Sequence, residues 1–152
     1  MISKLPWHLR LWAALLLGLL STGALAAGNP DKPFAEKHVV LQISDPDPFK
    51  QTLVLNVAGN LIKHYGPDKV DVEIVAFGPG LRLLLAENDN SDRIDNLVNS
   101  AQVRFSACEN TLAKYTQNLG HEPALNAHAT HVSAGVVRII DLIDQGYTLI
   151  KP

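Results

Sequence analysis

The chain has 152 residues and only one cysteine, Cys108. An internal disulfide is therefore impossible, and the thiol must be free, paired with another chain, modified, or buried and inert. No strong excess of charge is present either. A formal net charge of -2 gives no reason to expect binding to nucleic acid or to an anionic membrane surface. Internal repeats and low-complexity segments are also lacking, so the length fits one compact domain.

Long hydrophobic runs are scarce. The longest, residues 11–20 (LWAALLLGLL), falls short of the roughly 20 residues that span a bilayer. Basic Lys4 and Arg10 precede it, and residues 24–26 (ALA) form a small-x-small cleavage site. We expect residues 1–26 to be a secretory signal peptide rather than an uncleaved anchor, which leaves a periplasmic protein with no stable membrane anchor. A lipoprotein anchor is excluded because no cysteine lies near the cleavage point.

Strand and helix patterns alternate through the rest of the chain. Residues 27–36 are polar with two prolines and are expected to form a flexible lead-in. Alternating and apolar stretches predict strands at residues 38–44, 70–77, 103–108, 129–132 and 147–150. Helical spacing predicts a helix at residues 48–65, a short helix that opens at residues 81–86, and a helix after Ser91 in which Ile94, Leu97 and Val98 face inward. It also predicts helices at residues 109–119 and between Ser133 and Gly146. Such alternation implies a mostly parallel sheet with right-handed crossovers.

Capping residues and apolar stripes refine these helices. Asp47 is expected to cap the first, with Pro48 in its first turn, while Ser91 and Ser133 are expected to cap two later helices. The apolar run at residues 81–85 could belong to the core or to a subunit interface. The stripe expected to be buried on the last helix contains Val136, Ile139, Ile140 and Ile143.

Cys108 is expected where a strand gives way to the first turn of a helix. Free backbone N–H groups and the positive end of the helix dipole favour a thiolate there. In open α/β folds this is also the edge where ligands bind. The alternative is a small, buried apolar residue, because free cysteines are among the most buried residue types.

Several other residues are expected at the same edge. Gly78 and Gly80 lie in the turn after the second strand, where they could bring N–H groups to an anion or simply supply a tight turn with positive φ. Asn110 and Thr111 could hydrogen-bond a thiolate or persulfide, or satisfy local backbone. Asp45, after the first strand, could act in acid–base chemistry or simply be solvated.

Three histidines, His121, His128 and His131, gather with Glu122 in one stretch and resemble a loose zinc or copper site. Their spacing matches no defined metal motif, so neither a metal nor a cofactor is predicted. His131 precedes the last helix and could reach the pocket around the thiol.

Four motifs occur in order: residues 75–81 (VAFGPGL), 105–112 (FSACENTL), 134–139 (AGVVRI) and 145–147 (QGY). Together they resemble the DsrE/DsrF-like family, small proteins linked to sulfur relay, over residues 37–152. The pattern and the resemblance predict an α/β, flavodoxin- or Rossmann-like three-layer sandwich with about five mostly parallel strands. The resemblance also implies a persulfide on a cysteine placed like Cys108, and a homo-oligomer, either a trimer or a hexamer.

The favoured function is therefore a sulfur carrier or sulfurtransferase that uses Cys108, with a donor or acceptor protein or a small sulfur compound as its partner. One alternative is a non-catalytic ligand- or metal-binding module on the same fold, since oxidants outside the cytoplasm would consume an exposed persulfide. Another alternative is a structural oligomer without chemistry of its own.

Overall fold

The computed structural model describes residues 29–152, so the expected signal peptide lies outside the described residues. The strands are β1 (Lys37–Ile43), β2 (Val70–Ala76), β3 (Arg104–Cys108), β4 (Ala129–Val132) and β5 (Thr148–Ile150). The helices are α2 (Pro48–Tyr65), the 3₁₀-helix η1 (Gly78–Leu84), α3 (Ser91–Ala101), α4 (Glu109–Leu119) and α5 (Gly135–Asp144). The strands form one sheet in the order β4-β3-β2-β1-β5 with every neighbouring pair parallel, which confirms the predicted α/β class.

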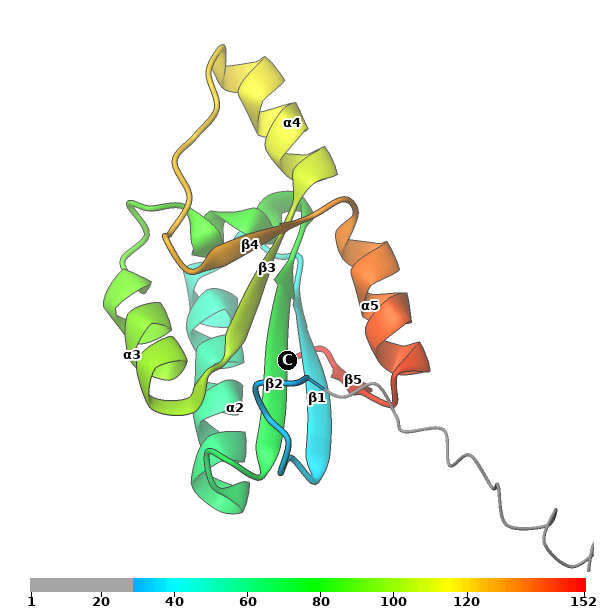
Figure 1. Ribbon diagram of the computed structural model, residues 1–152. Coiled ribbons are helices and arrows are strands. Elements are labelled where there is room, and N and C mark those ends of the chain that lie inside the picture. Colours follow the sequence, from blue (N-terminus) through cyan, green and yellow to red (C-terminus); the bar gives the residue numbers. More distant parts are fainter. Residues whose placement is uncertain (1–28) are drawn as a thin grey trace, which may run out of the picture.

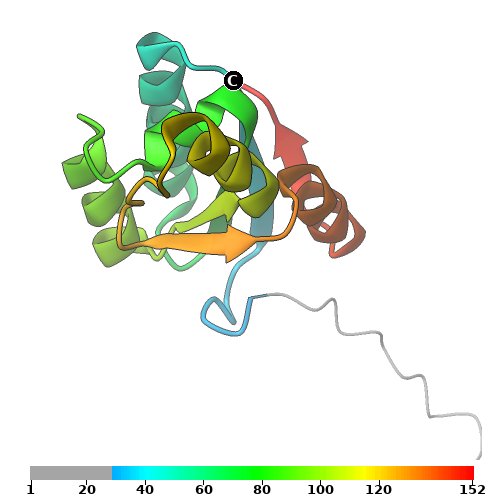
Figure 2. The ribbon, with the colours of Figure 1, turned by 90° about the horizontal axis from the view of Figure 1, so that it is seen from above.

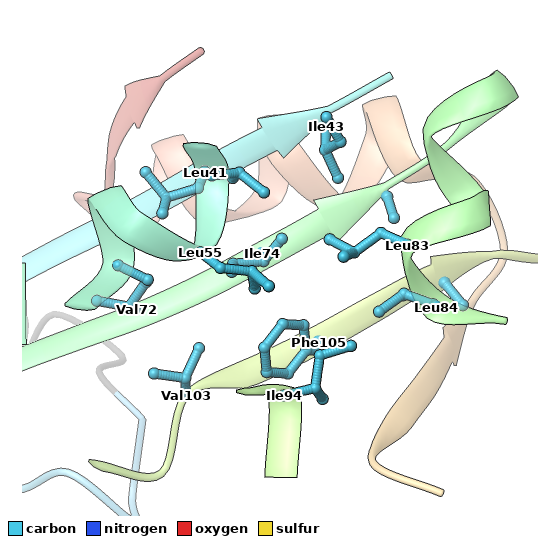
Figure 3. Close-up of a cluster of buried hydrophobic side chains, with 14 of the residues drawn as sticks. Leu41, Ile43, Leu55, Val72, Ile74, Leu83, Leu84, Ile94, Val103 and Phe105 are labelled. Atoms are coloured by element: carbon cyan, nitrogen blue, oxygen red, sulfur yellow. The ribbon is translucent and has the colours of Figure 1, made fainter. Parts of the chain in front are cut away.

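The sheet lies between two unequal helical layers (Figures 1 and 2). Helices α2 and α3, together with η1, cover one face and close over the main core, in which Phe105, Leu55 and Ile74 are almost completely buried (Figure 3). Helix α5 alone covers the other face, over a smaller apolar cluster that includes Ile139 and Leu142. Helix α4 begins directly after Cys108 and extends beyond the carboxyl edge of the sheet, away from both helical layers (Figure 1).

The central strand, β2, is buried at all seven positions. Its alternation of apolar and acidic residues would suit a strand with one wet face. Instead, Asp71 and Glu73 are 0% and 1% exposed and point to the α5 side of the sheet. A buried carboxylate needs charged or hydrogen-bonding partners, and the partners described below come from β3, from α5 and from the segment just before β5.

The predicted caps are correct at one helix and wrong at two. Asp47 caps α2, accepting a hydrogen bond from the Phe49 N–H at 2.9 Å. Ser91 is the first helical residue rather than the cap, and its hydroxyl donates to the Asn88 carbonyl at 2.9 Å. The last helix starts later than a cap at Ser133 requires, and no side chain caps it. Its first N–H groups are therefore left for another partner.

The buried stripe predicted for α5 is wrong except at Ile139. The residues that turn inward are Gly135, Ile139 and Leu142, with Arg138 half-buried beside them. The four large aliphatic residues that stay exposed, at 43% to 56%, are Val136, Val137, Ile140 and Ile143. The helix is rotated from the predicted orientation because the sheet below it carries a carboxylate, Glu73, which Arg138 meets.

Two further expectations are settled by burial. In the apolar run at residues 81–85, Leu81, Leu83 and Leu84 are fully buried, which confirms the core interpretation and excludes them as a free interface. The described part of the expected flexible lead-in is anchored by Lys32, which is 4% exposed. Its Nζ donates to the carbonyl of Ala101 at 2.6 Å, at the end of α3, and burial lowers the pKa of this amine.

Within residues 29–152, none of the helices combines the length and the apolar character needed to cross a membrane.

Candidate functional site

Cys108 stands at the junction of three elements. It is the last residue of β3 and the N-cap of α4, and it lies opposite Val132 in the parallel pairing with β4. Its exposure is only 5%, so the thiol is accessible through a narrow opening at most. The strand-to-helix junction predicted at this residue is confirmed.

Four hydrogen-bond donors surround the sulfur of Cys108. Burial by itself would raise the pKa of this thiol. Neighbouring donors, the Thr111 hydroxyl and the backbone N–H groups of Gly135, Thr111 and Asn110, nevertheless hold the pKa of the thiol below its ordinary value. Hydrogen bonds of this kind favour the charged form of the acceptor, so the site favours a thiolate.

These donors belong to two different helices. Asn110 and Thr111 lie in the first turn of α4, which begins directly after the cysteine. Gly135 is the first residue of α5. The positive ends of both helix dipoles therefore meet at one sulfur atom. This convergence is more favourable to an anion than the single helix that the sequence predicted.

Gly135 was missed in the sequence because its role depends on the end of β2. A Cβ at this position would lie 2.9 Å from Cβ of Phe77, closer than real side chains come. Glycine thus permits α5 to approach the sheet closely enough for its N–H to reach Cys108. The only local signal was a glycine two residues after Ser133, the expected cap of the last helix.

Thr111 links the thiol to the turn after β2. Its hydroxyl oxygen accepts a hydrogen bond from the Gly78 N–H at 2.8 Å, and the same hydroxyl helps to lower the pKa of the Cys108 thiol. Gly78 adopts a φ of 53°, which only glycine takes up readily. The structure therefore brings together four of the residues predicted for this pocket, namely Gly78, Cys108, Asn110 and Thr111.

Gly80 serves backbone packing rather than a ligand. A Cβ there would lie 2.4 Å from the carbonyl oxygen of Ile43 and 2.7 Å from Cα of Ser44. The turn after β2 is thus pressed against the end of β1, and only glycine fits between them.

Asp45 is partly exposed to solvent, and its carboxylate is paired with a neighbouring lysine. Its carboxylate forms an ion pair with Lys50 and accepts the Asp47 N–H at 3.0 Å. The Lys50 hydrogen bond, followed by the Asp47 N–H, lowers the pKa of Asp45. No hydrogen bond or ion pair among the described residues joins Asp45 to the thiol.

The three histidines do not come together. His131 lies 3.8 Å from a Glu109 carboxylate oxygen, and His128 lies 3.5 Å from Asp95. His121 contacts only the neighbouring Glu122 carbonyl, at 3.3 Å. In the part of the chain from residue 29 onward, no three His, Cys, Asp or Glu side chains form a group that could hold a metal ion.

A buried charged network, which the sequence analysis missed, lies on the α5 face of the sheet. The Glu73 carboxylate accepts hydrogen bonds from Arg138 Nε and Nη2, both at 2.7 Å, and from the Ser106 hydroxyl at 2.6 Å. Arg104 Nη1 lies 2.7 Å from the same carboxylate. Four polar contacts from β3 and α5 therefore compensate for the buried charge of Glu73.

The network continues to Asp71, which accepts from Arg104 Nη2 at 3.1 Å and from the Tyr147 hydroxyl. Burial, together with the hydrogen bond to Asp71, raises the pKa of Tyr147 and keeps it neutral. A sequence signal did exist: two acidic residues sit in a strand whose neighbours are strongly apolar. Their partners, however, could not be identified without the tertiary arrangement.

A separate cleft of about 530 Å³ opens between the segment after η1 and helix α4. It is lined by Arg82, Leu85, Asn88, Tyr115 and Leu119 among others, and it does not include Cys108. Because the cleft holds no polarised nucleophile comparable to the thiol, we place the candidate site at Cys108.

Fold and site together define a three-layer, parallel α/β protein whose single thiol is held between two helix N-termini. The chain is similar to the solved structure of a protein of unknown function, MTH1491 from Methanobacterium thermoautotrophicum. The two are 28% identical with a TM-score of 0.68, and the match covers 77% of this chain and all of that one. No family model and no curated protein matches the chain, so the DsrE/DsrF-like resemblance stays a prediction.

Proposed function

We propose that this protein carries sulfane sulfur as a persulfide on Cys108 and passes it between a sulfur donor and an acceptor. The observation that carries the proposal is the place of Cys108 at the N-cap of α4 and beside the start of α5, where neighbouring donors lower the pKa of its thiol. A sulfur carrier needs a stabilised thiolate and no separate base, because the thiolate is itself the nucleophile.

The loading step follows thiol–disulfide exchange. The Cys108 thiolate attacks the outer sulfur of a donor persulfide, R–S–SH, forming a new S–S bond. The donor's own S–S bond breaks, and its electron pair leaves on the donor thiolate. With thiosulfate the same attack releases sulfite. Neither route needs an added oxidant or reductant, and the reverse step delivers the sulfur to an acceptor thiolate.

The same N–H groups that surround the thiolate suit the product. A persulfide carries its negative charge on the terminal sulfur, one bond beyond the cysteine. Donors arranged around Cys108 by Asn110, Thr111 and Gly135 lie close enough to this charge to stabilise it. We place this chemistry in the periplasm, on the basis of the signal peptide expected at residues 1–26.

Intact-mass measurement of the periplasmic protein, prepared without reductant and then treated with reductant, tests the proposal. We expect a chain that begins at Ala27 and carries one or more extra sulfur atoms, which reductant removes. Incubation with thiosulfate or a small persulfide should restore the added mass. Cys108→Ser should take up none; sulfur loading of that variant equal to the wild type would overturn the assignment.

A second candidate is a ligand-binding module without thiol chemistry, which the 5% exposure of Cys108 favours. In this case the cleft between η1 and α4 would hold the ligand. Alkylation of the native protein separates the two functions. A thiol that resists a small alkylating agent until the protein unfolds, and that shows no sulfur loading, would favour the binding module.

A further inference from the structure

Helix α5 must be held in place for Gly135 to reach Cys108. Asn110 and Thr111 lie two and three residues after the cysteine, so their donors belong to the helix whose N-cap is Cys108. Gly135 belongs to a helix that arrives from β4 and covers the face of the sheet opposite to α2 and α3 (Figure 1). Its hydrogen bond to the sulfur therefore depends on where α5 lies on the sheet.

Apolar packing provides only part of this placement. The buried cluster beneath α5 contains five residues, whereas the cluster on the other face of the sheet contains nineteen. Of the α5 side chains, only Ile139 and Leu142 enter it. Apolar contacts are also non-directional, so a small cluster leaves the helix able to rotate and slide.

The Glu73–Arg138 pair provides a directional anchor. Two hydrogen bonds of 2.7 Å join the guanidinium fork to both carboxylate oxygens, a geometry that fixes orientation as well as distance. Glu73 is itself held on the sheet by Ser106 and Arg104 of the neighbouring strand. The anchor point on the sheet is therefore rigid, and the helix is the part that it positions.

Arg138 lies three residues after Gly135, on the same side of the helix and one turn from the N–H that meets the sulfur. We propose that Glu73 is a positioning residue for the Cys108 thiolate: by binding Arg138, it holds the start of α5, Gly135, at the edge where Cys108 pairs with Val132 of β4. The inference rests on the proposed function only because both take Cys108 as the functional thiol of the site.

The test is the thiolate population of Cys108 as a function of pH, measured by ultraviolet thiolate absorbance with the spectrum of Cys108→Ser subtracted. This readout needs neither sulfur loading nor reagent access, so failure of the sulfur-carrier function would not affect it. Besides Glu73 and Arg138, the titratable groups beside this edge are Glu109 of α4 and His131 of β4. Both remain unchanged in every variant.

The direction in which Glu73→Gln changes the thiolate population separates a purely electrostatic role of Glu73 from a positioning role. Removing the negative charge of Glu73 would, by Coulomb interaction alone, increase the thiolate population. Release of α5 should instead reduce it, by roughly threefold to tenfold at neutral pH, because a hydrogen bond to a charged group is lost. Asp71→Asn is the matched control: it removes the same charge from the same strand without touching Arg138, and should not reduce the thiolate population.

A second variant, Arg138→Lys, keeps the charge but loses the fork, and should also reduce the thiolate population. It decides the question if Glu73→Gln does not fold, as judged by circular dichroism. An equal or larger thiolate population in the folded Glu73→Gln protein, or an unchanged one in Arg138→Lys, would overturn the proposal. So would a loss in Asp71→Asn as large as that in Glu73→Gln.

Discussion

Replacing Thr111 with valine removes the side chain that links the thiol to the turn after β2. The substitution keeps the shape of the residue and deletes one donor to the sulfur of Cys108. Hydrogen bonds to charged groups contribute about 1.5–3 kcal/mol. Since about 1.4 kcal/mol corresponds to a tenfold change in an equilibrium constant, we expect the ratio of thiolate to thiol at a given pH to fall about tenfold or more.

The same substitution has a cost in stability. The Gly78 N–H donates to the Thr111 hydroxyl at 2.8 Å and would lose this acceptor. Gly78 is only half-buried, so water can replace part of the bond, and we expect a loss of about 1 kcal/mol in the free energy of unfolding. Urea unfolding at a pH where the thiol is protonated isolates this contribution from that of the thiolate.

Two controls define the result. Thr111→Ser retains the hydroxyl and should preserve most of the thiolate population. Thr116→Val removes a hydroxyl from the same helix, where it donates only to the Leu112 carbonyl at 3.0 Å, and should leave the thiol unchanged. If Thr111→Val titrates like the wild type, the donor arrangement described here does not govern the charge of Cys108.

Three further outcomes are expected. Gly80→Ala should lower the free energy of unfolding by about 1–3 kcal/mol, because the added Cβ would overlap backbone atoms of Ile43 and Ser44. Gly59→Ala, in α2, should raise it by up to about 1 kcal/mol, because a Cβ there has no neighbour within 4 Å. Equal effects of the two substitutions in urea titrations would contradict this. The chain should form a homo-oligomer that buries the exposed face of α5, so Ile140→Lys should yield monomers in sedimentation, and a monomeric wild type would refute it. Because folding lowers the pKa of Cys108, the stability that the wild type gains over Cys108→Ser should be complete above the ordinary thiol pKa of about 8.5 and disappear as the pH falls through the folded value. A difference independent of pH would count against a thiolate in the folded protein.

The elements that sequence patterns predicted well are those that depend on near neighbours. The cap at Asp47, the strand at residues 129–132 and the end of β3 at Cys108 all follow from residues within a turn or two. The part of the site that Asn110 and Thr111 contribute could be predicted from the sequence for the same reason. These residues lie in the first helical turn after the cysteine, so placing Cys108 at a helix start also places their donors.

The sequence-based predictions were wrong where the orientation of an element depends on a residue far away in the chain. Aliphatic spacing predicted that Val136, Ile140 and Ile143 would be buried, yet α5 turns Arg138 toward Glu73, which is 65 residues away in the chain. The cost of leaving a buried carboxylate unpaired outweighs the gain from covering aliphatic side chains that can remain at the surface. No local pattern reports that choice, because it depends on which strand lies beneath the helix.

The amino-acid sequence alone therefore determined the parallel α/β architecture, the position of the single thiol at a strand-to-helix junction, and the helix N-terminus that follows it. Only the tertiary structure decided that a second helix would donate to the same sulfur, and that a buried carboxylate–arginine pair would anchor that helix. The physical reason is range: capping and periodicity act within a few residues, whereas pairing of buried charges is satisfied between elements that meet only once the sheet has formed.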